Sequence, residues 1–119
     1  MTEKTNDIYI FEKDGETHQL VMTYGLLIKL LCVFGQIDDI TDIYIDPAKQ
    51  MEVLSCVSKT YKPDGTVEKE LFNPNLLTPE EGDNLKEWVA GHVFDYFQRA
   101  LLKIKEKEGM IKKIANLKV

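Results

Sequence analysis

The alternation of apolar and polar residues predicts a β-hairpin near the start of the chain. Residues 8–11 (Ile-Tyr-Ile-Phe) are β-branched or aromatic, as strand residues commonly are, and residues 18–22 (His-Gln-Leu-Val-Met) provide a return strand. Between them, Asp14-Gly15 is a strong turn signal, because glycine adopts a positive φ without strain. A two-stranded hairpin is only marginally stable in water, so we expect it to pack on a helix, gain a third strand or pair with another copy.

A buried helix is expected after this hairpin. Thr23 is a suitable N-cap, residues 26–34 are apolar on nearly every side of a helix, and Gly35 is a natural C-terminal stop. The next stretch, residues 36–46, is ambiguous. Its pattern fits a loop with either a short helix or a short strand, and the sequence leaves both open.

A second helix and a second hairpin follow. Asp46-Pro47 is typical of an N-cap with proline at the first helical position, which predicts a helix over residues 47–58. Its expected apolar anchors are Met51, Val53, Leu54 and Val57. Residues 62–65 (Lys-Pro-Asp-Gly) are a turn signal, and the short runs 60–61 and 66–67 on either side predict a small hairpin.

The clearest local signal opens a long C-terminal helix. Thr78 is a cap, Pro79 suits the first helical position, and Glu81 can close a capping box. Apolar residues then recur with helical spacing as far as Ile104. The predicted helix runs from Pro79 to near Glu108, about 45 Å at a rise of 1.5 Å per residue. Such a helix is long for so small a chain, so its far end should project.

These elements predict the α+β class. We expect one domain over residues 1–108, with an N-terminal β-hairpin followed by a small helical domain and its long C-terminal helix. Residues 109–119 are expected to form a basic amphipathic tail, with Gly109 as the joint. The length of 119 residues fits one domain, and an apolar fraction of 44% allows a modest core.

Charge is unevenly distributed, which limits the classes of partner. The net charge is −5, but residues 1–98 hold 8 lysines against 18 acidic residues, and residues 103–119 hold 6 lysines against 2 glutamates. An acidic body argues against nucleic-acid binding, which needs a broad positive surface. No apolar run has the length of a bilayer span, and the polar N-terminus is unlike a secretory signal. We therefore expect no membrane partner and a cytoplasmic location.

The cysteines and histidines are isolated from one another. Cys32 and Cys56 lie in apolar runs without Cys-x-x-Cys spacing, which predicts two buried thiols rather than a nucleophile or redox switch. His92 lies on the apolar face of the long helix, which favours a hydrogen-bonded core histidine over a base or metal ligand. His18 is expected at the surface.

Metal-binding and nucleotide-binding motifs are equally lacking. The acidic stretch 38–46 holds four aspartates without the central glycine and terminal glutamate of an EF-hand loop, which favours a solvated loop over a calcium site. No P-loop, Gly-x-Gly-x-x-Gly or Gly-x-Ser-x-Gly motif occurs. We predict a protein that is not an enzyme and that binds no cofactor or metal.

Apolar residues outside the predicted core indicate a protein-binding surface. Phe94 and Leu102 lie across the long helix from its core stripe, and either another subunit or one of two segments, the second hairpin or residues 36–46, is expected to cover them. In the tail, the apolar residues Met110, Ile111, Ile114 and Leu117 are predicted to form one helical stripe beside basic residues. Such a segment favours a groove in a partner protein over a membrane, with a frayed terminus as the plain alternative. The predicted partner-binding residues are Phe94, Leu102, Ile104, Met110, Ile111, Ile114 and Leu117.

Three segments in a fixed order carry a family resemblance. The hairpin IYIFEKDGETHQL runs into VMTYGLLIKLL, a helical middle follows, and an acidic-capped helix ends in WVAGHVFDYFQRALLK. This order resembles the small tail assembly chaperones of long-tailed bacteriophages, encoded beside the tape measure protein, and the resemblance extends to about Leu102. It implies a non-catalytic protein that coats the tape measure protein in the bacterial host cytoplasm, recruits tail tube protein and leaves before completion.

A permanent virion component is the alternative from another functional class. A head–tail connector, neck protein or capsid accessory protein would share the small size, the lack of a catalytic site and the tendency to self-assemble. Both interpretations predict a homo-oligomer.

Overall fold

The computed structural model describes residues 6–35 and 37–117, and of residues 37, 38 and 117 it describes the backbone alone. The chain has the α+β architecture that the sequence predicts. In chain order its elements are β1 (Ile8–Lys13), β2 (Glu16–Val21), α1 (Tyr24–Phe34), the 3₁₀ helix η1 (Ile37–Thr41), α2 (Asp42–Ile45), α3 (Pro47–Val57), β3 (Lys59–Tyr61), β4 (Val67–Glu70), the 3₁₀ helix η2 (Pro74–Leu76) and α4 (Pro79–Leu117).

The first hairpin forms around its predicted turn and packs on a helix. Asp14 and Gly15 both have positive φ, at 53° and 80°, as a two-residue hairpin turn requires. The inner face of β1 contacts α4, where the rings of Tyr9 and Trp88 lie 5.5 Å apart. Packing on a helix is therefore one of the three predicted ways to stabilise the hairpin that the fold uses.

Helix α1 begins at its predicted cap and is buried on one side. The Thr23 hydroxyl accepts a hydrogen bond from the Leu26 amide at 3.2 Å, and Gly35 ends the helix with a φ of 78°. The buried residues of α1 are Leu26, Leu27, Leu30 and Phe34. Burial on nearly every side was wrong, because Cys32 faces solvent. No element of the described chain covers that side of the helix.

The ambiguous stretch is helical, and α3 follows as predicted. Helices η1 and α2 occupy residues 37–45, and Ile43 is fully buried. The Asp46 carboxylate caps α3 by accepting from the Ala48 amide at 3.0 Å. Val53, Leu54 and Val57 anchor α3 in the core as predicted. Met51 does not, with 41% of its surface exposed, because it lies two residues from Val53 and therefore on the opposite side of the helix.

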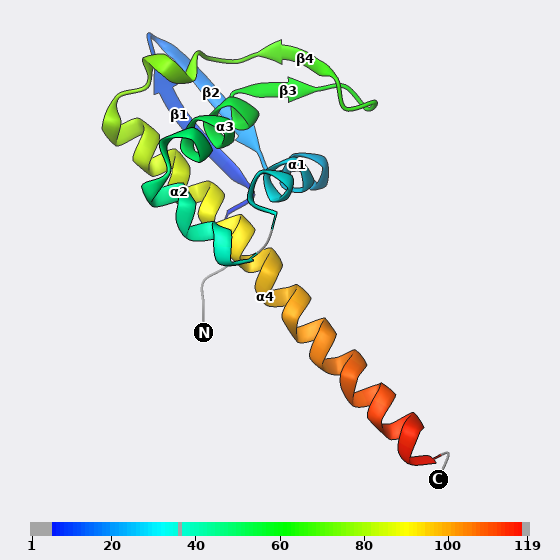
Figure 1. Ribbon diagram of the computed structural model, residues 1–119. Helices are drawn as coiled ribbons and strands as arrows, with labels where there is room; N and C mark the ends of the chain where they lie inside the picture. The colour runs from blue at the N-terminus through cyan, green and yellow to red at the C-terminus, as the bar shows by residue number, and fades with distance from the viewer. Residues whose placement is uncertain (1–5, 36, 118–119) are drawn as a thin grey trace.

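A second two-stranded hairpin, β3 and β4, forms as predicted and lies at the upper end of the body in Figure 1. Its turn closes with a hydrogen bond of 2.8 Å from the Lys62 amide to the Thr66 carbonyl, and Gly65 has a φ of 89°. Strands β3 and β4 pair only with each other within the described residues, so the fold contains two separate hairpins and no larger sheet.

Helix α4 is the longest element and gives the molecule its shape. The capping box is formed, since the Thr78 hydroxyl accepts from the Glu81 amide at 3.2 Å and the Glu81 carboxylate accepts from the Thr78 amide at 2.8 Å. The helix continues through Gly109 to Leu117, so the predicted end near Glu108 was wrong, and Gly109 lies within the helix. One glycine costs a helix only about 1 kcal/mol relative to alanine, which is too little to end it.

The first half of α4 lies against the core, and the second half extends away from it (Figure 1). The extents of the molecule are 68 × 32 × 27 Å. Within the body half, the Trp88 indole donates to the Asn6 carbonyl at 2.7 Å, and His92 Nε2 lies 2.9 Å from the same oxygen. Because a carbonyl only accepts, His92 donates from Nε2. His92 is therefore the hydrogen-bonded core histidine that its position predicted.

Candidate functional site

The exposed half of α4 is the most distinctive surface of the molecule. Leu85, Val89 and Val93 are at most 1% exposed and fix the helix in the core. Every residue from Leu101 to Asn116 is exposed. The helix therefore makes its tertiary contacts in its first half and presents its second half to solvent.

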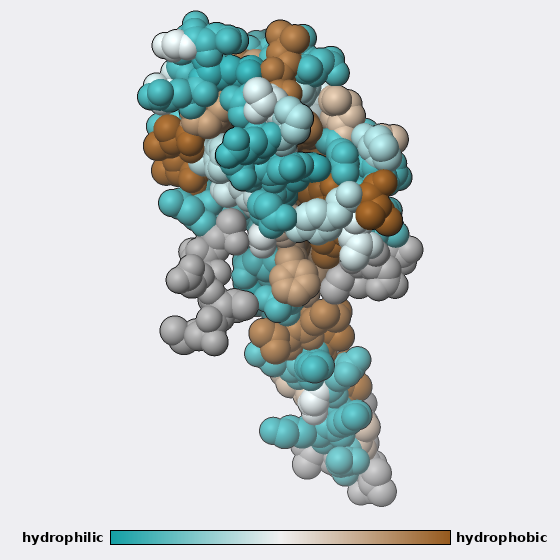
Figure 2. Space-filling model, turned by 90° about the vertical axis from the view of Figure 1, so that its left-hand side faces the viewer, coloured by the Kyte–Doolittle hydropathy of each residue, from teal (hydrophilic) through white to brown (hydrophobic). Residues whose placement is uncertain are grey.

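Four apolar residues follow one face of this helix. Phe94, Leu101, Ile104 and Ile111 are 48%, 47%, 52% and 65% exposed, and their spacings of seven, three and seven residues place them on one side. We call these four residues the helix stripe. Figure 2 shows apolar side chains gathered on α4 where it leaves the body. Glu108 interrupts the stripe between Ile104 and Ile111.

The upper end of the stripe borders a hollow in the body. Phe94 lines this hollow of about 400 Å³ together with Ile40, Thr41 and Tyr44 from η1 and α2. Phe94 was expected to be covered by another subunit or by a segment of the same chain. The segment 37–45 lies beside Phe94 but leaves 48% of the residue exposed. The apolar surface of the stripe thus continues from the projecting helix onto the body.

The other predicted partner residues are exposed but do not all share this face. Ile114 follows Ile111 by three residues and borders the stripe, with 50% exposure. Leu102 and Met110 point elsewhere around the helix, at 61% and 53% exposure, so the single stripe predicted through Met110 was too wide. The predicted contribution of the Leu117 side chain lies outside the described residues.

Leu101 belongs to the stripe but not to the predicted partner-binding residues, because the helical spacing of the apolar residues up to Ile104 includes it among the expected core positions. Its periodicity matches the core residues Val93 and Phe97, and periodicity alone does not show where a body ends. Its position seven residues after Phe94 was the available signal for a shared outer face.

The lysines of the projecting half add positive charge beside the stripe. They are Lys103, Lys105, Lys107, Lys112 and Lys113. The ion pairs among described residues are Lys13–Glu81, Lys86–Asp83 and Arg99–Asp95, so none of these lysines is neutralised within the described chain. The free charge is available to a partner, and salt should weaken its effect.

The cysteines and His18 lie on three different elements, α1, α3 and β2. Cys32 is exposed, which corrects the prediction of two buried thiols, and Cys56 is half-buried. Burial raises the pKa of the Cys56 thiol, and this effect outweighs the opposing fields of Lys29 and Lys59. His18 was expected at the surface, but it is half-buried with its ring 5.2 Å from that of Phe11. The described residues contain no group of three or more His, Cys, Asp or Glu side chains placed to hold a metal ion.

The sequence matches no family model, and comparisons with curated proteins and with solved structures return no match. Among the described residues, no helix combines the length and apolar character of a membrane span.

Proposed function

We propose that this protein is a non-catalytic tail assembly chaperone of a long-tailed bacteriophage. Its partner is the tape measure protein, which it keeps soluble in the host cytoplasm while tail tube protein is recruited. The observation that carries this proposal is the helix stripe, an apolar face on a helix that extends beyond the body. The order of hairpin, helical middle and long acidic-capped helix adds the resemblance to the chaperone family.

A holding chaperone needs exposed apolar surface on a carrier that does not itself precipitate. The stripe provides such a surface for long apolar helices, which recognise each other through residues spaced three and four apart. The body provides charge, with 18 acidic residues against 8 lysines over residues 1–98. The lysines of the projecting half would steer acidic stretches of the partner toward the stripe.

The test is co-production with the tape measure protein encoded beside the gene of this chain. Replacing Leu101 and Ile104 by serine removes two half-exposed apolar groups, each worth about 1–2 kcal/mol when a partner buries it. We expect the double variant to leave at least about tenfold less tape measure protein in the soluble fraction after centrifugation. Both side chains lie outside the core, so the melting temperature should stay within a few degrees of wild type.

A matched control is Val67→Ser, which alters an apolar residue with 51% exposure on β4, away from α4. This variant should hold the partner as wild type does. If the Leu101/Ile104 double variant leaves as much tape measure protein in the soluble fraction as wild type does, the proposal is contradicted. Mass spectrometry of purified particles separates the alternative, since a permanent virion protein would be present at fixed stoichiometry and a chaperone would be missing.

A further inference from the structure

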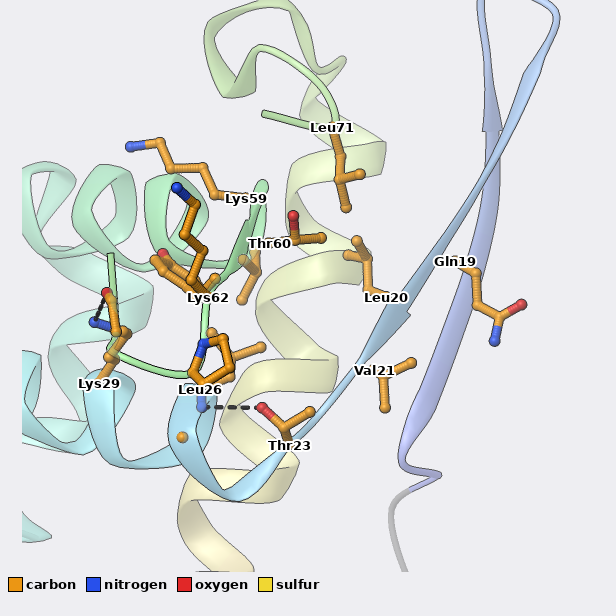
Figure 3. A pocket seen from close by; sticks show the side chains of 15 residues that line it. Gln19, Leu20, Val21, Thr23, Leu26, Lys29, Lys59, Thr60, Lys62 and Leu71 are labelled. Atoms are coloured by element: carbon orange, nitrogen blue, oxygen red, sulfur yellow. Dashed lines mark hydrogen bonds between the residues drawn. The ribbon is translucent and has the colours of Figure 1, made fainter. Parts of the chain in front are cut away.

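A half-open pocket lies between the two hairpins, on elements that the helix stripe does not involve. Its volume is about 400 Å³, and an apolar floor is formed by Leu20, Leu26, Val57 and Leu71. Figure 3 shows β2 with Gln19, Leu20 and Val21 on one side of this pocket, and Lys29, Lys59 and Lys62 on the other. Residues of two strands, β2 and β3, therefore line opposite sides of the pocket.

One wall is the unpaired edge of β2. The Met22 amide donates to the Asp7 carbonyl at 2.8 Å, which fixes the phase of the antiparallel ladder. Since hydrogen-bonded pairs alternate along such a ladder, Gln19 and Val21 direct their backbone groups away from β1. The Val21 carbonyl accepts from the Thr23 amide at 3.0 Å. Both backbone groups of Gln19 and the amide of Val21 remain without a partner in the described chain.

The facing wall is the unpaired edge of the second hairpin. The Leu71 amide donates to the Ser58 carbonyl at 2.7 Å, which sets the phase of this ladder. By the same alternation, Lys59 directs its backbone groups away from β4. The register shifts between Thr60 and Tyr61, but the Lys62 amide donates to the Thr66 carbonyl at 2.8 Å, so the backbone groups of Tyr61 also point away from β4. Lys59 and Tyr61 both line the pocket. The pocket thus separates two strand edges that have no neighbour in the described chain.

The pocket is positively charged on an acidic body. Three lysines and no acidic residue line it. The Lys29 ammonium donates to the Gly65 carbonyl at 3.1 Å and lies 4.7 Å from the centre of the Tyr61 ring, which holds it at the rim. Lys59 and Lys62 belong to no ion pair among the described residues. The charge favours an anionic occupant.

We propose that this pocket binds an extended acidic peptide segment of a partner protein, which adds to the edge of β2 as a further strand. The backbone of the peptide would pair with Gln19 and Val21, alternate apolar side chains would rest on the floor, and the intervening carboxylates would reach Lys59 and Lys62. A second copy of this chain is a poorer occupant, because its described strands already belong to hairpins packed on its own helices.

The test uses a fluorescein-labelled hexapeptide of alternating valine and glutamate, with blocked ends, and its valine–lysine counterpart. We expect fluorescence anisotropy to show saturable binding of the valine–glutamate peptide and no binding of the valine–lysine peptide. Lys62→Glu should weaken that binding roughly fivefold or more, because attraction becomes repulsion at the rim. Lys69→Glu is the matched control, with the same charge change on β4 outside the pocket, and should alter binding by less than about twofold.

Amide hydrogen exchange tests the backbone pairing separately. The amides of Gln19 and Val21 should exchange rapidly in the free protein and become protected when the glutamate peptide is added. No saturable binding, equal effects of Lys62→Glu and Lys69→Glu, or unchanged exchange at both amides would overturn the proposal. Protection that rises with protein concentration without peptide would overturn it too, since a second copy would then occupy the edge. The variants of the helix stripe should bind the peptide normally, which separates this site from the proposed chaperone function.

Discussion

At the scale of single residues, Glu81 links two distant parts of the chain. Its carboxylate accepts from the Thr78 amide at 2.8 Å and from the Lys13 ammonium at 2.9 Å, so it caps α4 and ties the first hairpin to it. The hydrogen bond from the Thr78 amide, followed by that from Lys13, lowers the pKa of Glu81 below its ordinary value of 4.5. The ionised form is the one that the folded state stabilises.

This lowered pKa predicts how Glu81→Gln depends on pH. A carboxyl with a lowered pKa in the folded state adds stability above its unfolded pKa and loses it as the pH falls through the folded value. Glutamine keeps the cap geometry without the charge. We expect the urea midpoint of Glu81→Gln to lie below that of wild type at pH 7 and the two to converge below about pH 4. Glu80→Gln is the control, since it alters the neighbouring acid, which makes neither of these hydrogen bonds, and should show no such convergence with wild type. A difference in urea midpoint between Glu81→Gln and wild type that stays the same at every pH would refute this role of the Glu81 charge.

At the scale of elements, α4 combines a buried half with a half that makes no contribution to the core. At 39 residues it is about 58 Å long at 1.5 Å per residue. Isolated helices are marginal in water, so the exposed half depends on propagation from the anchored half and on its lysine and glutamate content. Gly109 lies within it, with open space where a side chain would begin.

Truncation after Glu108 tests this division. We expect the melting temperature to stay within a few degrees, because the removed residues are exposed, and far-ultraviolet circular dichroism to lose the helical signal of the removed turns. Retention of the tape measure protein in solution should fall sharply, since Ile111 and Ile114 are removed. The full-length variant Gly109→Ala is the control and should retain partner binding. A truncated protein that unfolds would mean that the tail belongs to the core.

At the scale of the whole molecule, the chain is elongated and exposes apolar surface beyond the helix stripe. Its radius of gyration is 17.7 Å, against roughly 13.5 Å for a compact domain of this length. Besides the helix stripe, the outer face of the first hairpin exposes Ile8, Ile10 and Val21 at 42%, 62% and 45%. An exposed apolar hairpin face favours association through that face.

We therefore expect dimers or larger rings at micromolar concentration, measured by light scattering on a size-exclusion column. Ile10→Lys should shift the equilibrium toward monomer, because it places a charge at the centre of the outer face. Ile45→Lys is the matched control, on an exposed isoleucine of α2, and should leave the distribution unchanged. A monomer that persists at high concentration would count against self-association.

The sequence by itself determined the local geometry of the chain. Both hairpin turns, the caps at Thr23, Asp46 and Thr78, and the α+β class follow from residues that interact within about four positions of each other. Such signals are strong because the interacting groups are held close by the chain itself, whatever the rest of the molecule does.

Only the tertiary structure decided which apolar residues are covered. Cys32, Met51 and Leu101 carry the periodicity of core residues, yet they are exposed because no described element packs on their sides of α1, α3 and α4. Burial depends on distant segments that periodicity does not place. For the same reason, the two strand edges at Gln19 and Lys59 came to face one pocket only when both hairpins were packed on the helices.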